Sequence, residues 1–333
     1  MHILNTPIRV NHLELKNRLV MPPMATAKSD PDGHVTPAIC AYYDEKSAGG
    51  YIGLIITEHS YISQEGKASQ GQMSLSRDSD VSGLAQLVEV IRKNGCPVMA
   101  QINHAGSAAK TEITGREVLS ASPVQSPKGN SIPQEMTLDD IRKVIDDFTA
   151  AAIRVKKAGF DGVEIHSAHG YLLNQFYSPL ANKRTDEYGA HTIHSRLKLH
   201  LEVIKAVREA VGADYPVALR LGACDYMDGG STLEDSVAAA KILEEAGIDL
   251  LDISGGICGY VRPDTQEQGY FSELTEAVKK VVHIPVILTG GITDVNAAES
   301  LLEQGKADMI GVGRAMFKDS AWAENAMQSL QGR

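Results

Sequence analysis

The sequence predicts one (β/α)8 barrel, an α/β fold, that spans residues 1–333 as a single domain. Three observations favour this fold class. The length of 333 residues permits one large α/β barrel. Eight short runs rich in β-branched residues alternate with eight longer amphipathic stretches. The first run is followed by MPPMAT, whose prolines cannot form the GxGxxG turn of a doubly wound dinucleotide-binding sheet. No linker or internal repeat divides the chain.

The eight apolar runs are expected to form parallel strands, because a helix follows each run and can carry the chain back across the sheet. In chain order, the runs are Arg18–Met21, Gly53–His59, Pro97–His104, Gly162–Ser167, Pro216–Gly222, Asp249–Ser254, Pro285–Thr289 and Asp308–Gly313.

The helical stretches have capping residues at their starts, such as Thr137 with Asp140, Thr232 with Asp235, and Asp294. Glycines end several of them before the next strand. The stretches are Thr36–Ala48, Val81–Lys93, Leu138–Ala158, Ile193–Val211, Leu233–Ala246, Ser272–Val282, Val295–Gln304 and Ser320–Leu330.

Two connections are long, Ala105–Met136 after the third strand and Gly170–His191 after the fourth. Barrel active sites are built from the loops that follow the strands. We therefore expect a ligand site at this end of the barrel.

The composition excludes several classes of protein. There are 32 Lys and Arg residues against 42 Asp and Glu, and the net charge of −10 repels phosphate backbones and anionic lipid surfaces. The four cysteines lie far apart, without disulfide or zinc spacing. Neither a secretory leader nor a run of the ~18 apolar residues needed for a membrane span is present in the sequence. We expect a cytoplasmic protein that binds neither nucleic acid nor membrane, and its state as monomer or homo-oligomer stays open.

Glycines follow the seventh and eighth predicted strands, as Gly290 with Gly291 and as Gly313 before Arg314. Backbone amides of glycine loops, a nearby helix N-terminus and one arginine form a phosphate site, which this part of a barrel commonly supplies. We expect these four residues to bind a phosphate group. The alternative is that the glycines only permit tight turns.

Five segments of the chain resemble the Old Yellow Enzyme family of FMN-dependent ene-reductases. They are NRLVMPPMAT (17–26), AQINHAG (100–106), EIHSAHGYLLNQFYSPLANKRTDEYG (164–189), ALRLG (218–222) and GVGRAMF (311–317). The third segment is the most specific, because many residue types recur at fixed offsets. The PPMAT opening is similar to the flavin barrel of the enoate reductase and dienoyl-CoA reductase branch. Those larger relatives continue into an iron–sulfur segment, whereas this chain is expected to carry FMN only.

The resemblance implies a set of flavin-binding residues. Arg220 would lie against the pyrimidine edge of the isoalloxazine and stabilise the anion of the reduced ring. Gln101 would offer that edge both a donor and an acceptor. The remaining expected contacts come mainly from the backbone at the ends of the first two strands: Pro22, Pro23, Met24, Ala25 and His59.

The catalytic residues implied by the resemblance follow the fourth strand. His166 and His169 would donate to the oxygen of a conjugated carbonyl, so that the β-carbon accepts hydride from flavin N5. Tyr171 would protonate the α-carbon as general acid. The expected substrates are small enones or enoates, and NADH or NADPH would reduce the flavin in a ping-pong cycle.

Several alternatives stay open. His166 and His169 with Glu164 could ligate a metal, but no supporting carboxylate spacing accompanies them, and we expect no metal site. A C–N-cleaving amine dehydrogenase or demethylase, a phosphate-binding barrel lyase and a flavin sensor without turnover are the other candidate functions.

The chain also departs from the family pattern. Ala25 stands where many relatives have Cys or Thr, and a tyrosine common nearby is replaced around Ala27 and Lys28. Ser107 in HAGS replaces an arginine, so the expected site lacks one cation at its rim.

Overall fold

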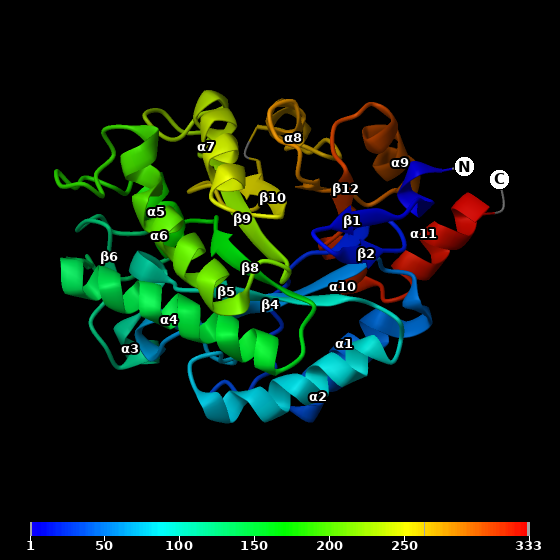
Figure 1. Ribbon diagram of the computed structural model, residues 1–333, viewed down its shortest axis with the longest axis horizontal. Coiled ribbons are helices and arrows are strands. Elements are labelled where there is room, and N and C mark those ends of the chain that lie inside the picture. The colour runs from blue at the N-terminus through cyan, green and yellow to red at the C-terminus, as the bar shows by residue number, and fades with distance from the viewer. Residues whose placement is uncertain (1, 263, 332–333) are drawn as a thin grey trace.

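Eight parallel strands close into a barrel in the computed structural model, which describes residues 2–262 and 264–331 (Figure 1). The structure confirms the predicted fold class, and each predicted run overlaps one strand. In order around the barrel the strands are β3 (Leu19–Met21), β4 (Leu54–Tyr61), β5 (Val98–Asn103), β8 (Gly162–Ser167), β9 (Val217–Cys224), β10 (Leu250–Gly255), β11 (Val286–Thr289) and β12 (Met309–Gly311), which pairs with β3.

The eight predicted helices surround the barrel. Thr137 and Thr232 accept the N–H groups of Asp140 and Asp235, and Asp294 caps its helix in the same way, as the sequence predicts. The helices are α1 (Pro37–Ser47), α2 (Val81–Arg92), α4 (Leu138–Lys157), α6 (Ile193–Val211), α7 (Leu233–Glu245), α8 (Ser272–Lys279), α9 (Val295–Glu303) and α11 (Trp322–Gln331).

The shorter elements were not predicted, because a few residues cannot display a hydrophobic period. The antiparallel pair β1 (Ile8–Val10) and β2 (Leu13–Leu15) precedes the barrel. The long connections and the segment after β12 hold α3 (Thr111–Thr114), β6 (Leu119–Ser120), β7 (Gln134–Glu135), α5 (Leu172–Tyr177) and α10 (Arg314–Lys318). Single 3-10 turns are η1 (Ile3–Asn5), η2 (Ala48–Gly50), η3 (Gln64–Gly66), η4 (Asp78–Asp80) and η5 (Gly106–Ala108).

The barrel interior changes character from one end to the other. Its lower part is an apolar cluster, and Val10 and Leu15 of the β1–β2 pair pack against it and close that end. Further along the same strands, alternate positions carry polar side chains, such as Gln101 two residues after Met99 and Arg220 two residues after Ala218. Because alternate residues of a strand face the same side, these polar groups lie at the carboxyl end of the barrel.

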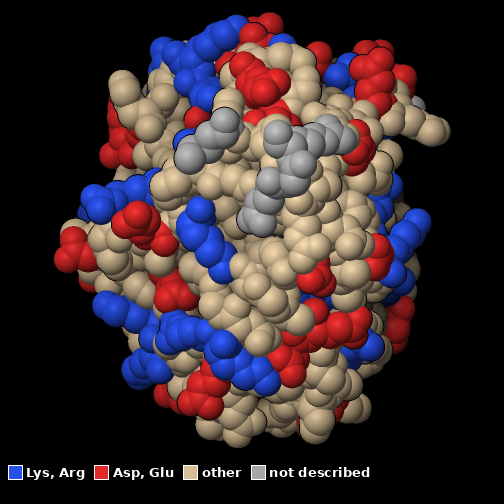
Figure 2. Space-filling view, turned by 90° about the vertical axis from the view of Figure 1, so that its right-hand side faces the viewer, with Lys and Arg blue, Asp and Glu red and all other residues tan. Residues whose placement is uncertain are grey.

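On the face that Figure 2 shows, basic and acidic side chains are interspersed. Within residues 2–262 and 264–331, no helix combines the length and apolar character needed to cross a membrane.

Candidate active site

A cavity of about 740 Å³ opens among the carboxyl ends of the barrel strands. Every site residue predicted from the sequence lines it except Gly290, whose carbonyl instead accepts the N–H of Gly269 at 2.6 Å. The lining residues are Pro22, Pro23, Met24, Ala25, His59, Gln101, Lys128, His166, His169, Tyr171, Arg220, Tyr260, Val261, Thr265, Gln266, Tyr270, Thr289, Gly291, Ile292, Thr293, Gly311, Gly313, Arg314, Ala315 and Lys318.

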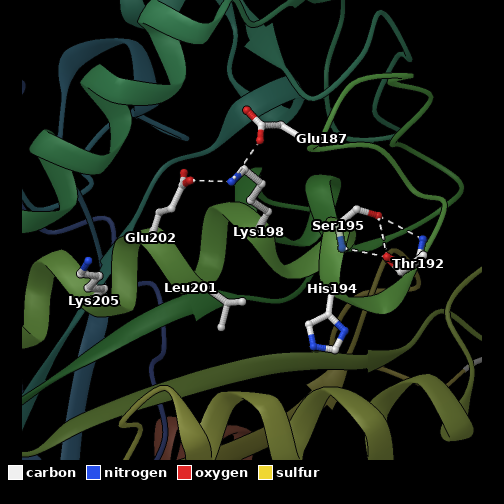
Figure 3. Close-up of a pocket in the computed structure, with 8 residues that line it drawn as sticks. All are labelled: Glu187, Thr192, His194, Ser195, Lys198, Leu201, Glu202 and Lys205. Atoms are coloured by element: carbon white, nitrogen blue, oxygen red, sulfur yellow. Dashed lines mark hydrogen bonds and ion pairs between the residues drawn. The ribbon is translucent and has the colours of Figure 1, made fainter.

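A second, more open hollow of about 480 Å³ lies against α6, outside the barrel (Figure 3). Lys198 lies between Glu187 and Glu202, with its Nζ 3.3 Å and 3.1 Å from their carboxylates. Both carboxylates thus pair with the same ammonium group, and we assign no site here.

A chain of buried polar side chains crosses the floor of the cavity. Gln101 on β5 donates its amide N–H to Glu164 on β8 at 2.7 Å. Arg220 on β9 pairs with Asp252 on β10, with Nε 3.0 Å from Oδ2. Register brings the pairs together, since Gln101 lies opposite Glu164 and Arg220 opposite Asp252. Both lining side chains, Gln101 and Arg220, are thereby held in fixed orientations.

Burial shifts the pKa values of the two carboxyl groups in this row of side chains. It raises the pKa of Glu164 to about 8, helped by the nearby charge of Asp252. Burial also raises the pKa of Asp252, and Arg220 opposes that shift. Glu164 is therefore mostly protonated at neutral pH, which leaves the Arg220–Asp252 ion pair beside it. An anion that develops in a ligand above Arg220 would be stabilised by the guanidinium.

His166 and His169 lie side by side, with ring centroids 5.1 Å apart. Burial and the charge of Arg220 hold the pKa of both imidazoles well below the usual 6.5, so both are neutral at physiological pH. Nε2 of His169 lies 2.7 Å from the hydroxyl of Ser254 on β10. Nδ1 of His166 is buried without a partner among the described residues, so the Nε2 side of that ring meets the cavity. Two neutral N–H groups can thus serve one acceptor oxygen.

A left-handed turn after β8 places Tyr171 over this pair. His169 has φ 61° and Gly170 has φ 72°, so the chain reverses and Tyr171 becomes the residue before α5. The Tyr171 ring lies 5.2 Å from His166 and 5.3 Å from His59, centroid to centroid. Burial and Tyr260 raise the pKa of Tyr171 to about 12, which keeps its phenol protonated. The phenol can therefore act as a proton donor.

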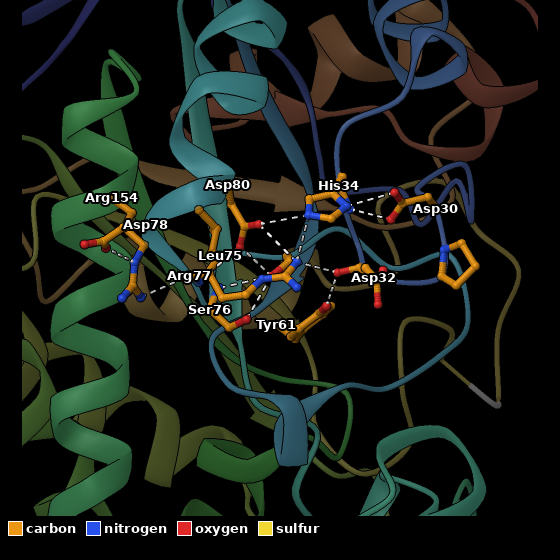
Figure 4. A network of polar contacts seen from close by, with 12 residues as sticks. Asp30, Asp32, His34, Tyr61, Leu75, Ser76, Arg77, Asp78, Asp80 and Arg154 are labelled. Atoms are coloured by element: carbon orange, nitrogen blue, oxygen red, sulfur yellow. Dashed lines mark hydrogen bonds and ion pairs between the residues drawn. The ribbon is translucent and has the colours of Figure 1, made fainter.

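The segment after β3 forms another wall of the cavity. The N–H of Thr26, next to Ala25, donates to the buried carboxylate of Glu58 at 2.5 Å. Further along, His34 is hydrogen-bonded through Nδ1 to Asp30, and Arg77 links His34 with Asp80 (Figure 4). These contacts fasten the β3–α1 connection to the segment before α2.

The predicted phosphate residues follow β11 and β12. A side chain on Gly313 would place its Cβ 2.9 Å from the sulfur of Met24, so the Met24 side chain would have to move to admit one. Arg314 donates to the hydroxyl of Tyr270 at 3.2 Å. Glycine amides and a guanidinium therefore border one part of the cavity.

Sequence reasoning missed several lining residues. Tyr260 and Tyr270 come from the β10–α8 connection, and Lys128 comes from the β5–α4 connection. Their only sequence signal is the length of those loops. Cys258 of the β10–α8 connection does not line the cavity, and its thiol lies near the carbonyls of Cys224 and Gly259.

A metal site at His166 and His169 would need further ligands close to them. Among the described residues, no three His, Cys, Asp or Glu side chains converge to hold an ion. Glu164 instead accepts from Gln101.

Comparison with known proteins identifies the family. The model of the NADH:flavin oxidoreductase / NADH oxidase family matches residues 3–332. The chain belongs to this family, that of Old Yellow Enzyme. The predicted resemblance is thereby confirmed, and Old Yellow Enzyme proteins are oxidoreductases that use FMN and NAD(P)H.

Three similar proteins illustrate the range of the Old Yellow Enzyme family. NADH oxidase of Thermoanaerobacter brockii is 40% identical over 329 residues, 97% of this chain and 50% of that protein. NADPH dehydrogenase of Bacillus subtilis is 35% identical over 327 residues, 98% of this chain and 94% of that protein. A solved 2-naphthoyl-CoA reductase in complex with 2-naphthoyl-CoA has a TM-score of 0.92 and 28% identity, covering 99% of this chain and 52% of that one. The chain spans about half the length of the first and third of these relatives.

The residues present fit the FMN of the Old Yellow Enzyme family. Gln101 and the ion-paired Arg220 are held where the polar edge of a ring system could contact them. Gly311 has no room for a side chain, because a Cβ would lie 2.0 Å from the Thr289 hydroxyl. Together with Arg314, these groups would hold a phosphate.

Proposed function

We propose that this chain binds FMN and reduces activated C=C bonds of α,β-unsaturated carbonyl compounds at the expense of NADH or NADPH. The observation that carries the proposal is the convergence of a neutral His166–His169 pair and a protonated Tyr171 on the cavity that contains Gln101 and Arg220. FMN, when bound, would supply the hydride that it has taken from the nicotinamide.

The residues of the chain would supply orientation and the proton. The imidazoles of His166 and His169 would donate hydrogen bonds to the carbonyl oxygen, which withdraws electrons from the β-carbon and stabilises the enolate. Tyr171 would give its proton to the α-carbon and regain one from solvent. The balanced reaction consumes one alkene, one NAD(P)H and one proton, and yields the saturated carbonyl compound and NAD(P)⁺.

The cofactor assignment is tested by a visible spectrum of the purified protein and mass spectrometry of the flavin released on heating. We expect a flavin spectrum and the mass of FMN, followed by bleaching with NADH or NADPH without oxygen and recovery with 2-cyclohexenone. A colourless protein that stays colourless after FMN is added would refute the proposal, and release of FAD would refute the phosphate-site assignment.

The Tyr171→Phe variant tests the proton donor. Its flavin should be reduced by NAD(P)H at the wild-type rate, whereas reoxidation by 2-cyclohexenone should slow by roughly 10²–10⁴-fold, the usual effect of a lost general acid. The deficit should shrink for a nitroalkene, whose hydride adduct is a stable anion.

Stopped-flow traces of both half-reactions measure this effect. Tyr51→Phe is the matched control, because the Tyr51 phenol contacts Glu324 and Gln328 outside the cavity. An unchanged oxidative step in Tyr171→Phe would assign the proton to another donor.

A further inference from the structure

Lys128 reaches the catalytic group from the long β5–α4 connection. Its Nζ donates to the carbonyl oxygen of His169 at 2.8 Å and lies 4.9 Å from the centre of the Tyr171 ring. The residue as a whole is exposed, yet it lines the cavity. Its alkyl stem thus runs from the protein surface to the opening of the cavity, and the ammonium group lies beside His169 and Tyr171.

The charges that line the cavity are all of one sign. The chain carries a net charge of −10, but the described lining residues include no Asp or Glu. Four of them are cationic: Lys128, Arg220, Arg314 and Lys318. An anionic occupant is therefore favoured in spite of the acidic surface.

Three of these cations have a place in the proposed flavin site. Arg220, which is paired with Asp252, would contact the flavin ring, and Arg314 and Lys318 belong to α10, next to the glycine loop. Lys128 differs from Arg220, because among the described residues its Nζ is bonded to a carbonyl and not to a carboxylate. Burial of the Nζ lowers the pKa of Lys128, as expected for a cation that has lost water without gaining a counter-ion.

Ser107 stands where the family commonly has an arginine, and this replacement makes the position of Lys128 significant. Ser107 is buried and bonded through its N–H to Gln175, so it is not a rim residue. Lys128 belongs to the same connection and brings a cation to the cavity from another direction.

We propose, building on the proposed ene-reductase function, that Lys128 determines the substrate class by binding the carboxylate of an α,β-unsaturated acid. A carboxylate activates an alkene poorly, because hydride addition places a second negative charge on the group. Hydrogen bonds from the neutral His166 and His169 do not offset that charge, whereas an ammonium at a partly desolvated mouth does. Enones and esters carry no such charge and would not need Lys128.

The proposal is tested with Lys128→Met and Lys128→Arg, using a 2-enoate such as cinnamate and its methyl ester as paired substrates. For Lys128→Met we expect kcat/KM with cinnamate to fall about ten- to a hundredfold, the loss of one charge-assisted hydrogen bond. The ratio of kcat/KM for the acid to kcat/KM for the ester should fall at least about tenfold, and Lys128→Arg should retain most of the activity with the acid.

Lys183→Met is the matched control. The Lys183 Nζ also donates to a loop carbonyl, that of Pro179, but it lies outside the cavity. Its loss should affect neither substrate.

A binding measurement separates this inference from the proposed function. Calorimetry should show benzoate binding to the FMN-loaded wild type and at least tenfold weaker binding to Lys128→Met, whether or not any alkene is reduced. Equal losses for acid and ester, or unchanged binding of benzoate, would overturn the role of Lys128. Reduction of neither substrate by the wild type would overturn the proposed function, and the benzoate titration would still decide on Lys128.

Discussion

The hydroxyl of Ser254 determines which nitrogen of His169 can face a ligand. It lies 2.7 Å from Nε2, and the neutral ring then has only Nδ1 available for the cavity. If the hydroxyl donates to Nε2, the proton resides on Nδ1, where it can be given to a substrate oxygen. Ser254 would thus act through His169 without touching the substrate.

We predict that Ser254→Ala slows alkene-dependent reoxidation by about tenfold, a typical effect of losing a group that orients a histidine. Reduction of the flavin by NAD(P)H should be unchanged, because it does not use the carbonyl site. Nitrogen NMR of labelled histidine should show His169 shifting from one tautomer to a mixture. Retention of a single tautomer in the variant would contradict this role.

Strand ends were the part of the site that the sequence could predict. Gln101, His166 and Arg220 occupy alternate inward positions of strands, so their side chains had to converge once the barrel was inferred. Ser254 occupies an equivalent position on β10, but a lone serine gives no chemical signal. Lys128 and Tyr260 lie in loops, whose paths depend on tertiary contacts that hydrophobic periodicity does not describe.

At the scale of elements, Arg184 joins the two long connections. It is 6% exposed, donates to the carbonyl of Met136 at 2.7 Å, and pairs with Asp186. The charged run of Lys183, Arg184, Asp186 and Glu187 predicts a solvated loop clasp, and this prediction is wrong for Arg184. The side chain is buried because the end of the β5–α4 connection folds over it.

We predict that Arg184→Met lowers the free energy of unfolding by about 2–4 kcal/mol, because Met136 and Asp186 lose a buried charged partner. Hydrogen exchange should also accelerate in residues 119–136 and 172–189. Arg142→Met is the control, since Arg142 and its partner Asp139 are both exposed on α4, and it should change the unfolding free energy by less than about 0.5 kcal/mol. Equal effects of the two substitutions would refute the role of Arg184.

The long elements of the fold could be predicted because each carries several repeats of its hydrophobic period. Capping pairs such as Thr137 with Asp140 gave the helix starts. The short elements could not: α5 has six residues, and all of them are buried by the surrounding connections. Tertiary packing, and not local propensity, selects the structure there.

At the scale of the whole molecule, Glu58 couples stability to pH. Its carboxylate is buried and accepts the Thr26 N–H, and burial raises its pKa from the ordinary 4.5 to about 7. Between these values the folded protein retains a proton that the unfolded chain releases. The contribution of Glu58 is therefore fully present below pH 4.5 and is lost as pH rises through about 7.

We predict that Glu58→Gln flattens this dependence. Between pH 5 and 8 the wild type should lose about 2–3 kcal/mol more of unfolding free energy than the variant, since each unit of pKa shift is worth about 1.4 kcal/mol and most of the shift falls in this range. Urea unfolding of both proteins at the two pH values measures the difference, and contributions from other buried groups cancel in the comparison. Parallel losses in the two proteins would contradict the prediction.

The left-handed backbone at His169 restricts which amino acids can replace it. Outside glycine, the side chains that tolerate a φ near 61° best are Asn, Asp and His. Only Asn and His among them keep a neutral N–H donor. Glutamine has the same amide as asparagine but lacks this backbone tolerance, and threonine and valine are branched at Cβ. The left-handed turn thus leaves two amino acids, Asn and His, that can supply a neutral N–H donor at position 169. Any redesign of the hydrogen bonding at this position has to choose between them.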